Sequence, residues 1–585
     1  MEKEKGLKRK WHFPGVGRII IFVFFVWFIL ACLIIPNINT VVSVFFQDGS
    51  FTLEPLQKLI SSDRAMRSLR NSFILAPTLS ITVGIVGVSL VLLTEYFDIK
   101  GAKILRLGYM TTLIYGGIIL VSGYKFIYGS NGYLTNIFAK IIPNFPTDWF
   151  EGYWAVLFVM TFACTSNHMI FLRNAMRSVD FQTVEAAQNM GAKPWYILRR
   201  VVLPVLTPSL LAVTILTFIT GLSATSAPML VGGTEFQTIT PMILSFSKST
   251  GSRDLAALLA VFLGLATILL LMAMTWIERK GHYMSVSKVK TTIVKQKIKN
   301  PVIRVLAHIY AYVLFLIYVV PVVLIILFSF TDSATIASRK LDFSKFTLKN
   351  YVSVFTNESA YRPFLVSILY SALASLAVAV IVILACRIIQ KKSRFSVPLE
   401  YCLLIPWLLP PTLIAMGLIT TYNVPSPLMC GIVLTGTAFI MFLGYLIIKI
   451  PFTLRMTKAA FFALDDSLED AARNLGAKPV YTFFRVLLPV IMPTILAIFA
   501  LNFNSLLGDY DLSVFLYHPL NQPLGVYIKS LTDSQTNADN TALTFVYAVL
   551  MMIISGIVLY LVYGRGNYDK TEKSSHSLTG FIHKK

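Results

Sequence analysis

The chain alternates between apolar segments of about 20 residues, long enough to cross a bilayer as helices, and shorter polar segments. Each apolar segment therefore predicts a membrane-spanning α-helix. We expect an all-α, polytopic membrane protein with about 12 such helices. The expected spans lie near residues 16–35, 72–94, 105–128, 153–172, 201–222, 255–277, 305–328, 364–386, 397–420, 430–450, 484–506 and 541–563.

The composition fits this prediction. Of the 585 residues, 56% are hydrophobic and 14% are charged, and the mean hydropathy is +0.70. These values exclude a soluble domain of this size. The formal net charge of +23 could suggest a nucleic-acid partner, but the basic residues gather in short loops between apolar segments, among them Lys449, Arg455 and Lys458. This distribution follows the positive-inside rule, so we expect the lipid bilayer and not nucleic acid as a partner.

The five cysteines, Cys32, Cys164, Cys386, Cys402 and Cys430, all fall in apolar segments, and none forms a CxxC pair. This pattern favours free thiols over a disulfide framework or a zinc site. No motif predicts a catalytic centre, and no metal site is assigned firmly.

The predicted spans divide into two sets of six. The expected units are a basic tail (1–16), a first half (17–277), a basic linker (278–304), a second half (305–563) and a polar tail (564–585). Because the linker and both tails are basic, we expect both termini in the cytoplasm and both halves crossing in the same direction. Phe51-Thr52-Leu53 and Phe346-Thr347-Leu348 stand at the same distance before a span, which supports a parallel repeat about an axis along the membrane normal.

A longer motif occurs once in each half. The first copy reads Glu185-Ala186-Ala187, then Gly191, and the second reads Asp470-Ala471-Ala472, then Gly476. A Leu-Pro pair follows each copy at the same spacing. Each Gly suits the left-handed residue that ends a helix, and Pro194 and Pro479 can begin the next one. The basic loops at 177–200 and 456–485 therefore predict a short helix with a smooth Ala face, suited to docking a partner protein. A surface helix repeated only through duplication is the alternative.

This pair of motifs resembles the cytoplasmic coupling loop of ATP-binding-cassette importer permeases, which reads Glu-Ala-Ala, Gly after three residues, then Ile-x-Leu-Pro. The departures are Asp470 in place of Glu, and Val201 and Val486 in place of Ile. The resemblance implies a type I importer fold in which each coupling helix docks on one of two cytoplasmic ATPase subunits. The implied ATPase-coupling residues are Glu185, Ala186, Ala187, Gly191, Asp470, Ala471, Ala472 and Gly476.

The chain has no Gly-x-x-x-x-Gly-Lys-[Ser/Thr] phosphate loop. We therefore expect no bound cofactor and no enzymatic activity in this chain, with ATP and Mg held by the partner ATPase.

Two permease halves fused in one chain are similar to ferric-iron transport permeases, with thiamine importers as close relatives. In the iron family an acidic residue followed by Leu stands after the fifth span, and Asp511-Leu512 matches it in the second half. Ser226 takes the corresponding place in the first half. Ferric ion prefers oxygen ligands, and a solvated loop acid is the alternative for Asp511. The candidate substrate-path residues are Asp509, Tyr510, Asp511, Tyr517, Asn502 and Asn504.

We therefore expect a permease of the bacterial plasma (inner) membrane that works by alternating access. It would receive its cargo, with ferric iron as first choice, from an extracytoplasmic binding protein. Thiamine, phosphonate and polyamine are alternatives within this class. An ion-coupled secondary transporter would also show internal repeats, but it would carry charges at the membrane midplane and would need no docking loop.

Overall fold

The computed structural model describes residues 15–561, except 48–49, 131, 177–178, 180, 281–294, 339–340, 391–394, 463, 465 and 534–537. Ten helices in this part are long and apolar enough to cross a membrane, or 12 if two bent helix pairs each count as one span. The predicted all-α polytopic class is therefore confirmed. The predicted C-terminal tail, nearly all of the N-terminal tail and the middle of the predicted linker lie outside the described residues.

The first half begins with a helix that continues through a π-helical stretch and ends in a β-hairpin, in which Phe46 pairs with Phe51. Its elements are α1 (Gly15–Phe28), η1 (Ile29–Ile34), α2 (Ile35–Phe45), β1 (Phe46–Gln47), β2 (Ser50–Phe51), α3 (Glu54–Ser61), α4 (Asp63–Val91), η2 (Leu92–Tyr96), α5 (Ala102–Tyr109), η3 (Thr111–Leu113), α6 (Gly117–Tyr128), α7 (Tyr133–Ile141), α8 (Tyr153–Met176), α9 (Phe181–Asn189), α10 (Pro194–Ile197), η4 (Leu198–Val202), α11 (Leu203–Leu222), α12 (Ser226–Val231), α13 (Ile239–Ser247), η5 (Thr250–Ser252) and α14 (Arg253–Lys280).

The second half follows the same plan. Its elements are α15 (Pro301–Ser329), α16 (Ser333–Ser338), η6 (Phe343–Lys345), α17 (Lys349–Thr356), α18 (Glu358–Gln390), α19 (Ser396–Leu408), α20 (Pro411–Tyr422), η7 (Pro427–Met429), α21 (Ala438–Phe462), α22 (Asp466–Asn474), α23 (Pro479–Thr482), η8 (Phe483–Leu487), α24 (Leu488–Leu507), α25 (Ser513–Leu516), η9 (Pro519–Asn521), α26 (Leu524–Asp533) and α27 (Ala538–Leu559).

The repeat is confirmed by the helix bounds. From the short motif helix to the end of the following span, each bound in the second half lies 285 residues after its counterpart, as 466 does after 181. The span ends, Leu222 and Leu507, keep this offset. So do the π-helical turns η4 and η8, which lead the chain into α11 and α24. Both halves therefore use one local design to join the motif helix to a span.

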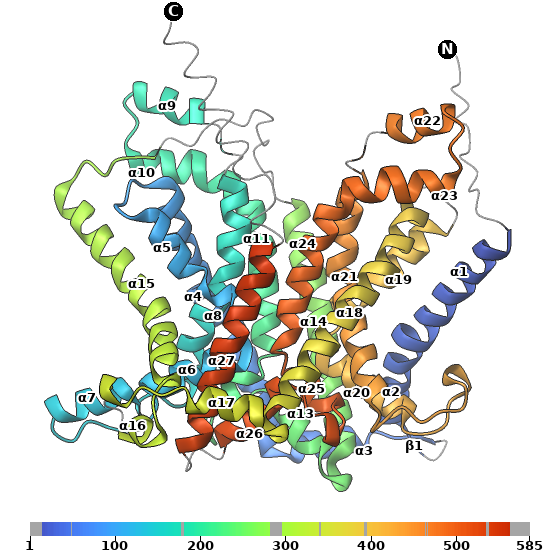
Figure 1. Ribbon diagram of the computed structural model, residues 1–585, viewed down its shortest axis with the longest axis horizontal. Coiled ribbons are helices and arrows are strands. Elements are labelled where there is room, and N and C mark those ends of the chain that lie inside the picture. Colours follow the sequence, from blue (N-terminus) through green and yellow to red (C-terminus); the bar gives the residue numbers. More distant parts are fainter. Residues whose placement is uncertain are drawn as a thin grey trace, which may run out of the picture.

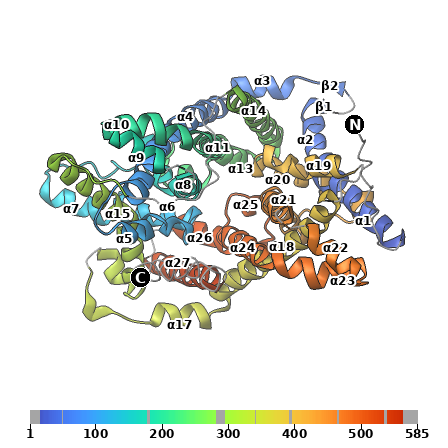
Figure 2. The same ribbon diagram turned by 90° about the horizontal axis from the view of Figure 1, so that it is seen from above.

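The first span of each half packs against the other half. Side chains of α1 and η1 share a hydrophobic core with α18–α21, and the Tyr422 hydroxyl donates to the Ala31 carbonyl oxygen, 2.5 Å away. Conversely, the Tyr109 hydroxyl donates to the Ala311 carbonyl oxygen of α15, 2.7 Å away. Figure 1 shows α1 beside α19 and α15 beside α5, and Figure 2 shows α1 and α15 at opposite ends of the bundle. The two halves of the sequence are thus interlocked in space.

The third span of each half, predicted over 105–128 and 397–420, is broken into two helices. In the first half the chain bends by 113° between η3 and α6, and in the second half it bends by 104° between α19 and α20. Gly117 has a φ of +57° at the first bend. Pro410 and Pro411 stand at the second, where they cannot donate backbone hydrogen bonds to continue α19.

The fourth span of the second half lies later than predicted. It was expected over 430–450, but α21 covers Ala438–Phe462. Cys430, Gly431 and Gly436 all have positive φ, so the chain before α21 forms turns. The exposed Cys430 thus lies outside the spans, whereas Lys449, expected in a cytoplasmic loop, lies within one. All five cysteines are free, as predicted.

Candidate functional site

The two motif helices stand at one end of the bundle, beyond the ends of the spans (Figure 1). Each ends in the same hydrogen-bonded turn. The Gly191 N–H donates to the Gln188 carbonyl oxygen at 2.9 Å, and the Gly476 N–H donates to the Arg473 carbonyl oxygen at 2.9 Å. Both glycines have a φ of +80°, as their left-handed role requires.

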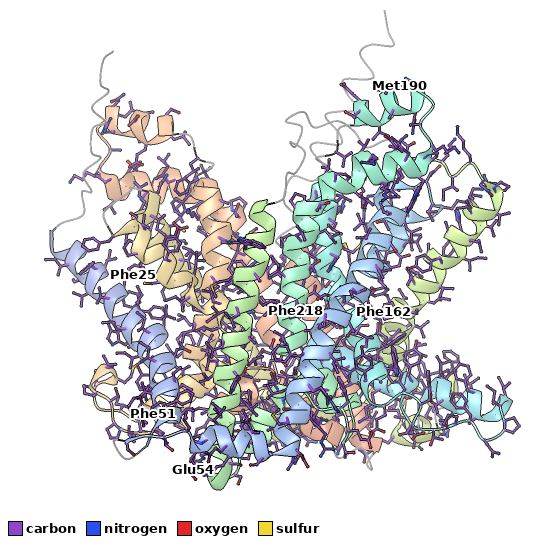
Figure 3. All side chains as sticks on the ribbon, turned by 180° about the vertical axis from the view of Figure 1, so that it is seen from behind. Phe25, Phe51, Glu54, Phe162, Met190 and Phe218 are labelled. Atoms are coloured by element: carbon purple, nitrogen blue, oxygen red, sulfur yellow. The ribbon has the colours of Figure 1, made fainter. Side chains whose placement is uncertain are left out.

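Each turn presents an apolar side chain to solvent. Met190 is 82% exposed and Leu475, at the same place in the second copy, is 88% exposed. Figure 3 shows Met190 at the tip of its helix, at the edge of the molecule. The next helix of each copy adds further exposed apolar residues, namely Trp195, Tyr196, Val480 and Tyr481. We call these four residues, together with Met190 and Leu475, the docking tips. They are Met190, Trp195 and Tyr196 in the first half and Leu475, Val480 and Tyr481 in the second.

The predicted coupling residues lie directly behind the docking tips. Glu185, Ala186 and Ala471 are exposed, Ala187 and Asp470 are half-buried, and Ala472 is buried. The Asp470 carboxylate pairs with Arg473 of its own helix at 3.1 Å. The structure thus brings the motif residues of each half together, but sequence reasoning missed the docking tips. Their only signal was a large apolar residue just before each turn Gly.

The candidate substrate-path residues lie at the opposite end of α24 from the motif helix. Asn502 donates to the Thr453 hydroxyl oxygen at 2.8 Å, and Asn504 donates to the Ser555 carbonyl oxygen at 3.4 Å, so both described contacts join neighbouring helices. Tyr510 is buried, and its hydroxyl contacts the Met229 sulfur at 3.3 Å. Tyr517 is half-buried between the two larger hydrophobic cores.

The two acids differ in their surroundings. Asp509 Oδ2 accepts a hydrogen bond from the Ser513 N–H at 3.0 Å and so caps α25. Asp511 keeps accessible surface, and its Oδ1 accepts a hydrogen bond from the Ser226 hydroxyl at 3.1 Å. Ser226 and Asp511 are 285 residues apart, so the residues that correspond in the two halves meet each other. This contact therefore joins the two halves at corresponding positions.

The charged side chains described at this junction, Asp509, Asp511 and Lys449, belong to the second half. Desolvation by the surrounding protein raises the pKa of Asp511 to about 7, although its side chain keeps accessible surface, and the neighbouring Asp509 charge raises it further. Burial also raises the pKa of Asp509, whereas Lys449 lowers it. The Lys449 amine donates to the Ser505 hydroxyl of α24 at 2.6 Å. At the 285-residue offset the first half carries Cys164, Thr220, Ala224 and Ser226 instead, none of them charged.

Metal ligation needs several donors in one place. Within the described residues, no group of three or more His, Cys, Asp or Glu side chains could hold a metal ion. Asp511, Asp509 and Ser226 could receive a cation in passing, with Lys449 limiting the negative charge.

The repeated helical plan is that of a membrane protein made of two fused, similar halves. The profile of a family described as binding-protein-dependent transport system inner membrane component matches residues 107–280 and again 300–565. The chain belongs to this family, and it is an ATP-binding-cassette importer permease.

Several named proteins are similar to this chain. A protein of Sinorhizobium fredii named a probable ABC transporter permease is 37% identical over 96% of this chain and 98% of its own length. A ferric transport system permease protein of Actinobacillus pleuropneumoniae is 19% identical over 92% of this chain and 77% of its own. The solved structure of a bacterial ABC transporter involved in the import of alginate covers 46% of this chain and 96% of its own, with 17% identity and a TM-score of 0.40.

Proposed function

We propose that this chain is the transmembrane subunit of an importer in the bacterial plasma membrane, powered by two cytoplasmic ATPase subunits. Each docking tip would enter a groove of one ATPase subunit. The observation that supports this most directly is the pair of docking tips, which have equal geometry and expose large apolar side chains beyond the membrane spans. Exposed apolar patches of this kind mark protein interaction sites.

The polarity of the chain follows from this proposal. The docking elements, the linker and both termini would lie in the cytoplasm, and α3, α7 and α17 at the other end would face an extracytoplasmic binding protein (Figure 1). ATP and Mg would bind to the ATPase subunits, and this chain would contribute movement only. Alternating access would pass the cargo between the halves, where Asp511 meets Ser226.

The docking assignment is tested by placing a bulky charge on the smooth face of each motif helix. Ala186→Arg and Ala471→Arg should abolish the ATP hydrolysis that the loaded binding protein stimulates, because the Arg side chains would hold the ATPase away. Ala186→Ser and Ala471→Ser, which keep a small, uncharged side chain at the same exposed positions, are the matched controls and should keep stimulated hydrolysis. Wild-type stimulation in both Arg variants would show that ATPase subunits do not dock here.

For the cargo, ferric iron remains the first proposal. Asp511 and Asp509 offer the hard oxygen donors that ferric ion prefers, at the junction of the halves. Radiolabelled iron uptake, in cells in which this importer is the sole iron route, tests the proposal. Asp511→Asn should lower uptake most at limiting iron, because a charge at the entrance mainly assists capture. Uptake of thiamine or a polyamine, with no uptake of iron, would show that the cargo assignment is wrong, whereas the proposal that the chain belongs to an importer would stand.

Lys449 favours a second candidate, a cargo that carries an anionic group, such as a phosphonate. A fixed ammonium group inside α21 would attract an anion and repel a bare metal ion. A charge inside a span is also what an ion-coupled transporter would show. However, the chain belongs to a family of ATP-binding-cassette importer permeases, which argues against an ion-coupled transporter.

A further inference from the structure

The second motif helix is tied to a membrane span by a partly buried ion pair. Glu469, the residue just before Asp470, accepts two hydrogen bonds from the Arg387 guanidinium, with Nη2 to Oε1 at 2.7 Å and Nη1 to Oε2 at 3.1 Å. The Arg387 side chain is 8% exposed and that of Glu469 is 25% exposed. Two parallel N–H···O bonds between a planar guanidinium and a carboxylate fix distance and direction together.

Arg387 also holds the neighbouring segments. It lies near the end of α18, donates to Gln390 Oε1 at 2.9 Å, and stacks over the Phe483 ring at 5.9 Å from its centroid. Phe483 begins η8, the turn that leads from the motif helix into α24. One side chain therefore joins a span, the motif helix and the entry to the next span. The helix that carries Arg387, α18, packs along both α21 and α24, the helices that carry Lys449 and Ser505.

The first half cannot form this ion pair. The 285-residue offset places Val184 at the position of Glu469, and Val184 is fully buried. The Phe-Thr-Leu repeats, at 51–53 and 346–348, place Leu92 at the position of Arg387. Neither residue carries a charge. The first motif helix is thus held by apolar packing where the second is held by an ion pair.

The linker between the halves supplies a different attachment. The Gln188 side chain on α9 donates to Gln296 Oε1. The Gln296 backbone N–H donates to the Tyr96 carbonyl oxygen at 2.8 Å, and its carbonyl oxygen accepts from the Asp98 N–H at 2.9 Å. The linker thereby bridges α9 and the segment after α4. These contacts are between neutral groups, and the Gln188–Gln296 contact is exposed, so they hold the helix less stiffly than a partly buried ion pair.

We propose that Arg387 and Glu469 form the mechanical link through which the second motif helix drives the spans, so that the two ATPase-docking elements act unequally. Arg387 is then a positioning residue that moves α18 and α24 with the docking element. This proposal rests on the proposed function, because it needs an ATPase at α22. It adds that the second docking element transmits its movement through charge and the first through packing.

The experiment uses the whole importer in proteoliposomes, with its copurifying ATPase and iron-loaded binding protein. Arg387→Gln and Glu469→Gln should assemble with the ATPase and keep basal hydrolysis, but lose at least about fivefold of the stimulation by the binding protein, the lower end of ordinary coupling effects. Iron transported per ATP hydrolysed should fall as well. Glu95→Gln is the matched control. Glu95 pairs with Arg106 and Arg173 at 3.2 and 3.1 Å near the same end of the first half, and these pairs join spanning segments without a motif helix.

A single substitution leaves one buried charge without its partner and could hinder folding. The double variant Arg387→Gln with Glu469→Gln removes both charges and should fold. Because the two residues act as one link, its stimulation should be no lower than that of either single variant. Wild-type stimulation in the assembled double variant, or an equal loss in Glu95→Gln, would overturn the proposal. If Ala471→Arg also kept full stimulation, the docking assignment would be the part that failed.

Discussion

The turn glycines allow a physical test of the docking geometry that separates backbone conformation from side-chain contact. Gly191 and Gly476 have a φ of +80°, and a Cβ added at either position would meet no atom within 4 Å. Replacement by Ala therefore costs only the strain of a left-handed L-residue, about 1–2 kcal/mol. That strain shifts the local equilibrium about 5–30-fold away from the observed turn. Because the turn orients Met190 and Leu475, both docking tips would be misplaced.

The expected result is weaker binding of the ATPase, by up to about 5–30-fold for each Ala substitution, with the spans intact. Titration of the purified permease variants with the ATPase measures this change directly. Gly476→Asn should recover most of the affinity, because Asn enters the left-handed region more readily than Ala.

The matched control is Gly152→Ala. Gly152 has a φ of +83° and equally open space, but it precedes α8 at the other end of the molecule. The Gly152→Ala substitution should cost the same free energy of backbone strain, but it changes neither docking tip. ATPase binding that is equal in Gly476→Ala, Gly476→Asn and the wild type would refute the reasoning, because the turn conformation would then not matter for docking.

The remaining predictions concern the pathway and the topology. Because the pKa of Asp511 is raised to about 7, its charged fraction should increase from about one tenth at pH 6 to about nine tenths at pH 8, and iron uptake should increase with it. Asp511→Asn should flatten this pH profile, and an unchanged profile would remove the proposed role of the carboxylate. If ferric iron is the cargo, Lys449→Gln should keep iron uptake at or above the wild-type rate, whereas a marked loss would favour an anionic cargo. Cys430 is exposed in the turn before α21, whose other end leads to α22, so an impermeant thiol reagent should label it in right-side-out vesicles and not in a Cys430→Ser variant. Labelling of Cys430 in inside-out vesicles alone would reverse the proposed orientation.

The spans and the repeat could be predicted from the sequence because they depend on local properties. A segment of apolar residues long enough to cross the bilayer must satisfy its own backbone hydrogen bonds, and a helix does so without any distant partner. The motif turns also depend on local properties, because Gly191 and Gly476 can adopt the left-handed backbone conformation without help from distant residues. The bends at Gly117 and Pro410 also had a local signal, which the length of the apolar segments concealed.

The neighbours of each helix could not be predicted in this way. Lipid tails are as apolar as Leu, so hydrophobicity places a helix in the membrane but does not select its partners; close packing and a few polar contacts do. The tertiary structure alone therefore decided that α1 covers the second half and α15 the first. It alone placed Lys449 inside a span, brought Ser226 onto Asp511, and joined Arg387 to Glu469. Sequence thus determined which segments cross the membrane, whereas the packing of helices distant in the chain determined which charges meet.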